Sequence, residues 1–181
     1  AAAAVGEDPE TTADILETAI SQIGDSIKDT KNISVSLRPL TLDDLGILST
    51  IDWYSRQFSK RHRDIRLIRK AELLEEEIDD SLKIVIYRVL QEALKNVARH
   101  SDADTVHVRL RKTDHHLTFE VEDNGCGFDV DRVLNATSAM AYGLQNMRDR
   151  TEICGGTFRV DSVPGRGTCI RIQLPIDSPP T

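Results

Sequence analysis

The chain has 181 residues, of which 39% are hydrophobic and 29% charged, a balance typical of one ordinary globular domain plus an extra element. No run of 18 apolar residues and no signal peptide are found, which argues against a membrane span, and the formal net charge of −7 argues against a general nucleic-acid-binding protein. Three cysteines without metal-ligand spacing indicate a reducing compartment, so we expect a cytoplasmic location.

The first predicted element is a long helix that runs from Asp8 to Arg38. Asp8 is a candidate N-cap, Pro9 suits the first helical position, and the residue before Pro39 is disfavoured in a helix. Its apolar positions form a narrow stripe, which consists of Ile15, Ala19, Ile23, Ile27, Ile33 and Leu37. So narrow a seam favours packing against another helix in a bundle over packing on the chain's own domain.

A second helix is predicted to begin at Thr41, because the residues Thr41-Leu42-Asp43-Asp44 have the form of a capping box. Its apolar face consists of Ile47, Ile51, Tyr54 and Phe58. The basic cluster from Lys60 to Arg66 follows this helix. We interpret that cluster as a solvated turn.

Residues 65–71 are predicted to form a short strand, and a third helix begins at Asp79 or Asp80. The apolar stripe of that helix consists of Leu82, Ile86, Val89, Ala93 and Val97. Alternation of apolar and polar residues then predicts two half-buried strands, over residues 105–112 and 117–123. The apolar positions of these strands are Val106, Val108, Leu110, Leu117, Phe119 and Val121.

Residues 129–142 are small and weakly patterned, so we expect a loop or a lid there. A helix that ends at Gly155-Gly156 follows. The last two strands are joined by residues 164–167 and turn Ile170, Ile172 and Leu174 inward. From Ile65 onward this order of elements predicts a mixed sheet with helices on one face, which is an α+β two-layer sandwich preceded by a long helix.

The third helix carries a row of polar residues beside its apolar stripe. Glu92, Asn96 and His100 are spaced by four residues and therefore share one face, with Arg99 beside them. This pattern fits a binding site, and it fits a solvated helix face equally well.

The stretch 121–128, "VEDNGCGF", ends an inward-facing strand with Asp123. One interpretation is a plain hairpin, because Asn124-Gly125 is a strong turn signal. The other is a ligand site. A buried carboxylate is costly unless a donor reaches it, and an adenine amino group is such a donor. Gly125 and Gly127 lack a Cβ, so the turn can approach a flat ring closely.

Two more glycine motifs complete the set. Gly143 is predicted to begin a helix after the loop, and free N–H groups at a helix start bind phosphate. The sequence "GRGT", which runs from Gly165 to Thr168, connects the last two strands. Each motif is weak when taken alone.

Together and in this order, the motifs resemble those of the GHKL ATPase superfamily over roughly residues 63–175. The N-box is "QEALKNVARHS", and the three glycine boxes are "DNGCGF", "YGLQNM" and "GRGT". The stretch "LRPLTLDDLGI", residues 37–47, is similar to the junction in bacterial two-component sensor histidine kinases with short lids. The resemblance favours the ligand-site interpretation of residues 121–128.

The resemblance implies roles at the phosphate end of a nucleotide. Asn96 would bind Mg²⁺, and Glu92 would be the base or orienting group near the γ-phosphate. Arg99 and His100 would lie near the phosphates, and the backbone of Gly143 and Leu144 would face them.

It also implies roles at the adenine end. Asp123 would accept a hydrogen bond from the adenine amino group, and Gly125 and Gly127 would shape the floor of the pocket. Met147 would form an apolar wall. Thr168 of the third box would lie near the adenine end, and Gly165 and Gly167 of the same box are also expected to bind ATP.

The resemblance implies an ATP-dependent protein histidine kinase. We expect residues 1–40 to be the second helix of a dimerisation domain, residues 41–177 to be the ATP-binding catalytic domain and residues 178–181 to be a disordered tail. The expected partners are an acceptor-histidine helix, a response regulator and a second copy paired through the N-terminal helix. None of the five histidines precedes His62, so we expect the acceptor to be missing and the chain not to label itself.

Two alternatives stay open. An anti-sigma-type serine kinase of the same superfamily would not need the long helix or the junction. A nucleotide-sensing dimeric interaction module would bind ATP weakly without catalysis, which the presence of Glu92 and Asn96 argues against.

Overall fold

The computed structural model describes residues 40–113 and 115–176. Contacts divide the chain into two compact units, Ala1–Leu40 and Thr41–Thr181, and the sheet of the protein belongs to the second unit. The long helix predicted from Asp8 and the predicted disordered tail lie outside the described residues. None of the helices in the described ranges combines the length and hydropathy that a membrane span requires.

Five strands form one mixed sheet in the order β1-β2-β3-β5-β4. The strands are β1 (Arg66–Glu72), β2 (Thr105–Lys112), β3 (His116–Asp123), β4 (Thr157–Ser162) and β5 (Thr168–Pro175). β1 and β2 are parallel, and the other neighbours are antiparallel. A parallel pair needs a crossover connection, which the segment containing α3 provides.

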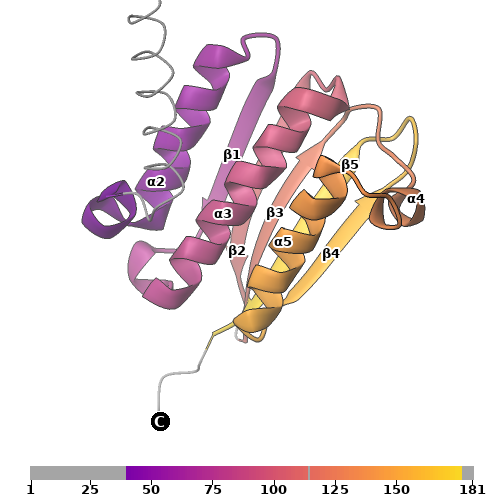
Figure 1. Cartoon of the computed structure of the whole chain (residues 1–181). Helices are drawn as coiled ribbons and strands as arrows, with labels where there is room; N and C mark the ends of the chain where they lie inside the picture. The colour runs from indigo at the N-terminus through magenta and orange to yellow at the C-terminus, as the bar shows by residue number, and fades with distance from the viewer. Residues whose placement is uncertain (1–39, 114, 177–181) are drawn as a thin grey trace, which may run out of the picture. The chain divides into compact units, whose positions relative to one another are not determined.

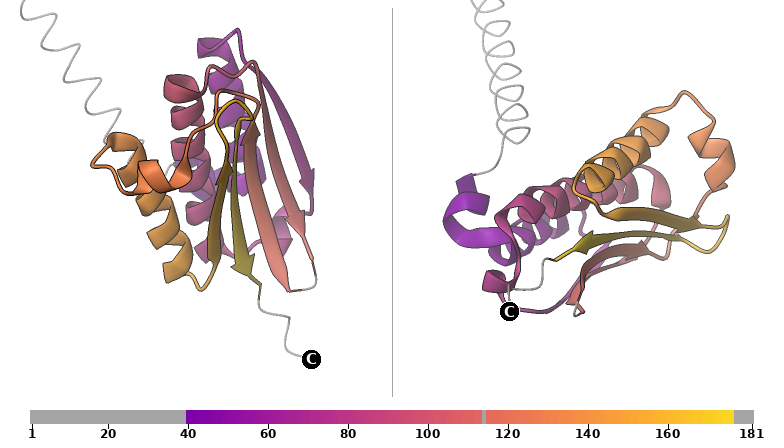
Figure 2. Two further views of the ribbon diagram at one scale, coloured as in Figure 1. Left: turned by 90° about the vertical axis from the view of Figure 1, so that its right-hand side faces the viewer. Right: turned by 90° about the horizontal axis from the view of Figure 1, so that it is seen from below.

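The helices α2 (Leu40–Arg61), α3 (Asp80–Asn96) and α5 (Ala139–Ile153) cover one face of the sheet and leave the other face open (Figures 1 and 2). Shorter elements complete the unit: a 3-10 turn (Glu75–Glu77), a π-helical turn (Val97–Ser101) and α4 (Val130–Leu134). The predicted two-layer sandwich is thus confirmed.

The core lies between the helices and the sheet, where the predicted stripes meet. The five apolar positions predicted for the third helix are all buried, four of them in α3 and Val97 in the π-helical turn, and so are the inward-facing residues of β2, β3 and β5. Ile86, Val106, Phe119 and Ile172 are completely buried. Burying an aliphatic or aromatic side chain of this size contributes about 1.5–3 kcal/mol, so the periodic residues supply most of the packing between the layers.

The α2 helix contains a break at Gly46, where φ is 78° and ψ is 177°. The carboxylate of Glu75 caps the helical segment that begins after the break, because it accepts the N–H groups of Ile47 (2.8 Å) and Leu48 (2.9 Å). Lys83 lies 3.0 Å from the same carboxylate. A Cβ at position 46 would overlap the Glu75 carboxyl group, so the glycine permits both the turn and the cap.

Two expectations need correction. Residues 129–142 are not simply a loop, because α4 lies within them and α5 already begins at Ala139, with Ser138 as its N-cap. β3 is not half-buried, because Thr118 and Glu120 on its second face are buried as well. β3 is the central strand, and the arginines of β2 and β5 cover its open face: Arg111 and Arg171 both pair with Glu120.

Candidate functional site

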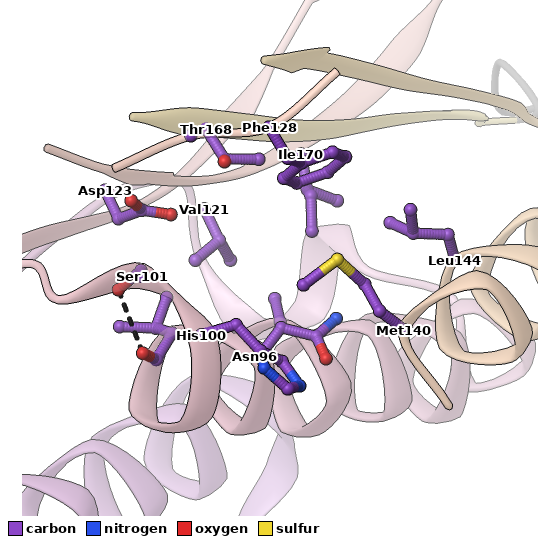
Figure 3. Close-up of a pocket in the computed structure, with 13 residues that line it drawn as sticks. Asn96, His100, Ser101, Val121, Asp123, Phe128, Met140, Leu144, Thr168 and Ile170 are labelled. Atoms are coloured by element: carbon purple, nitrogen blue, oxygen red, sulfur yellow. Dashed lines mark hydrogen bonds between the residues drawn. The ribbon is translucent and has the colours of Figure 1, made fainter. Parts of the chain in front are cut away.

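A pocket opens between the ends of β3 and β5 on one side and α3 and α5 on the other (Figure 3). It brings together six of the residues predicted from the sequence: Asn96, His100, Asp123, Gly127, Leu144 and Thr168. Seven other residues complete its wall: Ala93, Val97, Ser101, Val121, Phe128, Met140 and Ile170. The wall is therefore mostly apolar, with a few polar groups at defined places, as expected of a small-molecule site.

Asp123 lies at one end of this pocket and is only 9% exposed. Its Oδ1 accepts the N–H of Gly125 at 2.8 Å, and the N–H of Thr168 also donates to this carboxylate. Burial raises the pKa of Asp123 above its ordinary value, although these two hydrogen bonds partly oppose the effect. No described lysine, arginine or histidine forms an ion pair with it. The carboxylate is therefore held as an acceptor that lacks a cation.

Three glycines bring backbone segments together around Asp123. A Cβ at Gly125 would overlap the carbonyl oxygen of Ser101, and one at Gly167 would overlap that of Asp123 itself. A Cβ at Gly127 would overlap the carbonyl oxygen of Val163. Gly127 also lines the pocket, whereas Gly125 and Gly167 do not. Within the described structure, Gly125 and Gly167 therefore act through backbone packing beneath the site.

Hydrogen bonds fix the same segments. Cys126 N–H donates to Ser101 O and Gly165 N–H donates to Cys126 O, both at 2.6 Å. The Asn124 side chain accepts the N–H groups of Asp104 (3.2 Å) and Thr105 (3.0 Å). These bonds join the end of the N-box, the first glycine box and the third. Asn124 was expected only as a turn residue, and its fixing role depends on long-range contacts.

Gly143 does not begin a helix, contrary to the expectation. It is the fifth residue of α5, and only the first four N–H groups of a helix lack an intrahelical partner. The Ser138 hydroxyl accepts the N–H of Ala141 at 3.1 Å, so the helix is already capped there. The glycine instead allows close approach to α3, because a Cβ at position 143 would lie 2.5 Å from Glu92 Oε1.

Glu92 does not line the pocket and stands at its margin. Its carboxylate pairs with Lys95 Nζ at 3.1 Å, and 25% of its side chain is exposed. Lys95 is not among the residues of the predicted polar row, so this pair is a finding of the structure. Glu92 is therefore placed next to the second glycine box by Gly143 and is held by a neighbouring cation.

The π-helical turn after Asn96 separates the two basic residues of the N-box. His100 is exposed and lines the pocket with Asn96 (Figure 3). Arg99 is exposed too, but it lines a different cleft beside His62 and Lys95. Arg99 and His100 are consecutive residues of this turn, so their side chains leave the helix axis in different directions and only His100 reaches the pocket.

The apolar wall differs from the prediction. Met147 is 1% exposed and belongs to the core, whereas Leu144 does line the pocket. Phe128 and Met140 line it as well and were not predicted. Phe128 is the last residue of the first glycine box, which is a signal that could have found it. Met140 stands alone among small residues and carries no comparable signal.

No group of three or more histidine, cysteine, aspartate or glutamate side chains in the described ranges is arranged to hold a metal ion. Asn96 is an amide that lines the pocket and can supply one oxygen ligand. A magnesium ion fits such a position when phosphate oxygens and water provide most of its ligands.

Comparisons with known proteins agree with this architecture. Residues 82–178 match the family described as histidine kinase-, DNA gyrase B-, and HSP90-like ATPase. The oxygen sensor histidine kinase NreB of Staphylococcus carnosus is 35% identical over 150 residues, which cover 83% of this chain and 42% of that protein. The chain thus spans less than half the length of this curated relative.

Solved histidine kinase structures share the fold. The histidine kinase domain of a blue-light-activated histidine kinase from Erythrobacter litoralis EL346 superposes with a TM-score of 0.58 at 19% identity, covering 70% of this chain and 59% of that one. The mycobacterial sensor histidine kinase MprB superposes with a TM-score of 0.55 at 23% identity, covering 71% of this chain and 94% of that one.

Proposed function

We propose, from the premise that this chain belongs to the histidine kinase-, DNA gyrase B- and HSP90-like ATPase family, that it is the ATP-binding catalytic domain of a sensor histidine kinase. The observation that carries the proposal is the 35% identity to a named sensor histidine kinase across 83% of this chain. The family implies ATP binding, and the pocket that contains Asp123 and Asn96 is the place we assign to it.

We assign the adenine to the end of the pocket formed by Asp123 and Thr168. The buried carboxylate of Asp123 would accept one N–H of the adenine amino group, which compensates for its removal from water. Val121 and Ile170, which line the pocket and belong to the core, would contact the ring. Phe128 would cover it from the side of the first glycine box.

We assign the phosphates to the end near Asn96 and His100. Magnesium would neutralise phosphate charge there, with the Asn96 amide oxygen among its ligands. Both side chains come from the end of α3 and the turn after it, so one element would set the phosphate position. Gly143 and Leu144 are proposed to lie opposite the phosphates. They would shape that side of the pocket by close packing and would not bind the phosphates through free N–H groups.

The proposed reaction is phosphoryl transfer to a histidine on a separate helix. An imidazole nitrogen forms a bond to the γ-phosphorus, the bond to the β–γ bridging oxygen breaks, and ADP leaves with that oxygen. Glu92 would orient the imidazole or take its proton, which requires the carboxylate to part from Lys95. Such catalysis depends mainly on positioning and charge stabilisation. The phosphoryl group would then pass to an aspartate of a response regulator.

We propose the corresponding organisation of the whole protein. Residues 1–40 would be the second helix of a dimerisation domain, and residues 41–177 the catalytic domain. Two copies would pair through the N-terminal helix. Because no histidine precedes His62, the acceptor would have to come from a segment outside this sequence.

Calorimetry with ADP and Mg²⁺ tests the nucleotide site, on the unaltered chain and on Asp123→Asn. We expect binding by the first and loss of binding by the second. Labelled ATP then tests the kinase: this chain alone should incorporate no phosphate, and it should label a supplied acceptor-helix domain. Incorporation by the chain alone, or absence of nucleotide binding, would contradict the proposal.

A further inference from the structure

Asp123, Thr168 and Ser162 form a polar row across three neighbouring strands. Asp123 on β3 pairs with Thr168 on β5, and Thr168 pairs with Ser162 at the end of β4. Directly paired residues place their side chains on the same face of a sheet. Asp123 and Thr168 line the pocket, whereas Ser162 stands behind Thr168 and belongs to no predicted site.

The Ser162 hydroxyl makes three contacts. It accepts the N–H of Phe128 at 2.9 Å, donates to the carbonyl oxygen of Gly167 at 3.1 Å, and lies 2.9 Å from Thr168 Oγ1. A hydroxyl has one proton to donate and two lone pairs that accept. Its proton goes to Gly167, because a carbonyl can only accept. The proton in the remaining contact must therefore come from Thr168.

This assignment fixes which side of the Thr168 hydroxyl donates a hydrogen bond and which side accepts one. Because its proton points back to Ser162, Thr168 Oγ1 presents only lone pairs to the pocket. The neighbouring Asp123 carboxylate is an acceptor as well. The base end of the pocket thus offers two acceptors, and both are oriented by backbone groups of the first and third glycine boxes.

We propose that Ser162 determines base specificity by holding Thr168 as an acceptor, an inference that rests on the proposed nucleotide site. A purine with an amino group at position 6 supplies N–H donors to this end of the pocket. A purine with an oxo group there places an acceptor against two acceptors, which leaves buried polar groups unpaired. Ser162 acts through Thr168 and is a positioning residue.

The test compares ADP with inosine diphosphate, which differs from it at position 6 of the base and at the adjacent ring nitrogen. In Ser162→Ala the Thr168 hydroxyl is free to rotate and donate to the oxo group. We expect the preference for ADP over inosine diphosphate, measured by calorimetry, to fall about three- to tenfold, the equivalent of one hydrogen bond. Ser162→Thr keeps the hydroxyl and should retain the preference.

A double-mutant cycle separates positioning from structure. In a Thr168→Val background, Ser162→Ala should change the preference no further, because the group through which it acts is gone. Ser138→Ala removes a hydroxyl at the α5 N-cap instead and should leave the preference unchanged. If Ser162→Ala does not fold, Ser162→Cys carries the same test, because a thiol is a much weaker donor and acceptor than a hydroxyl and should lower the preference in the same direction.

The outcomes distinguish the two proposals. If Ser162→Ala weakens both nucleotides equally, so that the preference is retained, Ser162 has only a structural role and this inference is wrong. If the unaltered chain binds neither nucleotide, the proposed function fails, and the inference falls with it.

Discussion

β3 buries two carboxylates, one on each face of the sheet, in opposite surroundings. Glu120 faces the open side, is 3% exposed and pairs with Arg111 and Arg171. Burial alone would raise the pKa of Glu120, but the hydrogen bonds and charges of these two arginines lower it. Asp123 faces the helices with no described cation beside it, and burial raises its pKa.

The difference in surroundings distinguishes a carboxylate suited to a structural role from one suited to bind a ligand. A buried charge that is fully paired has no free acceptor to offer a ligand, and removing it destabilises the fold because its partners are left without a counter-charge. A buried charge that is held only by backbone N–H groups retains an unsatisfied acceptor, and a ligand with a donor can satisfy it. Glu92, partly exposed and paired with one lysine, is intermediate between the two.

The largest expected effect comes from Asp123→Asn. Replacing the acceptor by an amide removes a charge-assisted hydrogen bond and can place a donor against the adenine amino group, so ADP affinity should fall about a hundredfold. The thermal unfolding midpoint should stay the same or rise, because an unpaired buried charge is removed. Calorimetry and thermal unfolding measure the two. A large loss of stability with affinity retained would reverse the roles assigned to the two faces.

Glu120→Gln, on the same strand, should lower the stability of the protein and leave its nucleotide affinity almost unchanged. It leaves two arginines without their common carboxylate and should lower the free energy of unfolding by about 2 kcal/mol, less than for a fully buried pair because both arginines are partly exposed. ADP affinity should change less than about twofold. Denaturant unfolding measures the first quantity and calorimetry the second. An affinity loss as large as that of Asp123→Asn would contradict the separation.

Lowering the pH should abolish nucleotide binding before it unfolds the protein. In the proposed site Asp123 accepts a hydrogen bond as a carboxylate, so affinity should be full above its raised pKa and should fall as the pH drops through that value, which lies above the ordinary value of about 3.9. The contribution of Glu120 to stability is fully present above the ordinary glutamate pKa of about 4.3 and is lost only as the pH falls through its lowered pKa. Calorimetry and circular dichroism over one pH series should therefore give separate midpoints. Coincident midpoints would count against the contrast.

The smallest effect on stability is expected for Gly143→Ala. Alanine favours the helix by about 1 kcal/mol, which offsets the close approach to the flexible Glu92 carboxylate, so the unfolding midpoint should hardly move. Displacing that carboxylate should nevertheless slow phosphate transfer to a supplied acceptor helix. Tyr142→Ala, at the exposed neighbouring position, is the control and should transfer normally. Equal rates in both variants would show that Glu92 needs no precise placement.

Sequence reasoning succeeded where the signal is local. The stripe of α3 and the alternation in β2 follow from periodicity, and the place of Asp123 and Thr168 in the pocket follows from motifs. It failed where the burial or the contacts of a side chain depend on strand pairing across the sheet. Glu120 is buried because β3 is central, and Ser162 reaches Thr168 only through the β4–β5 register. The early start of α5 does not follow from the sequence pattern, because the small residues around the Ser138 cap carry no apolar periodicity.

The pairing of β3 with β5 also has a consequence for how the protein folds. β2 with β3, and β4 with β5, are hairpins between consecutive strands, whereas β3 and β5 are separated by all of α4 and α5. Loop-closure entropy makes such distant pairing slow. Asp123 and Thr168 face each other across the β3–β5 pairing, so neither hairpin alone could form the proposed base end of the pocket. The proposed binding site would therefore form only when the two halves of the sheet pair, and a bound nucleotide should then stabilise the fully folded chain selectively.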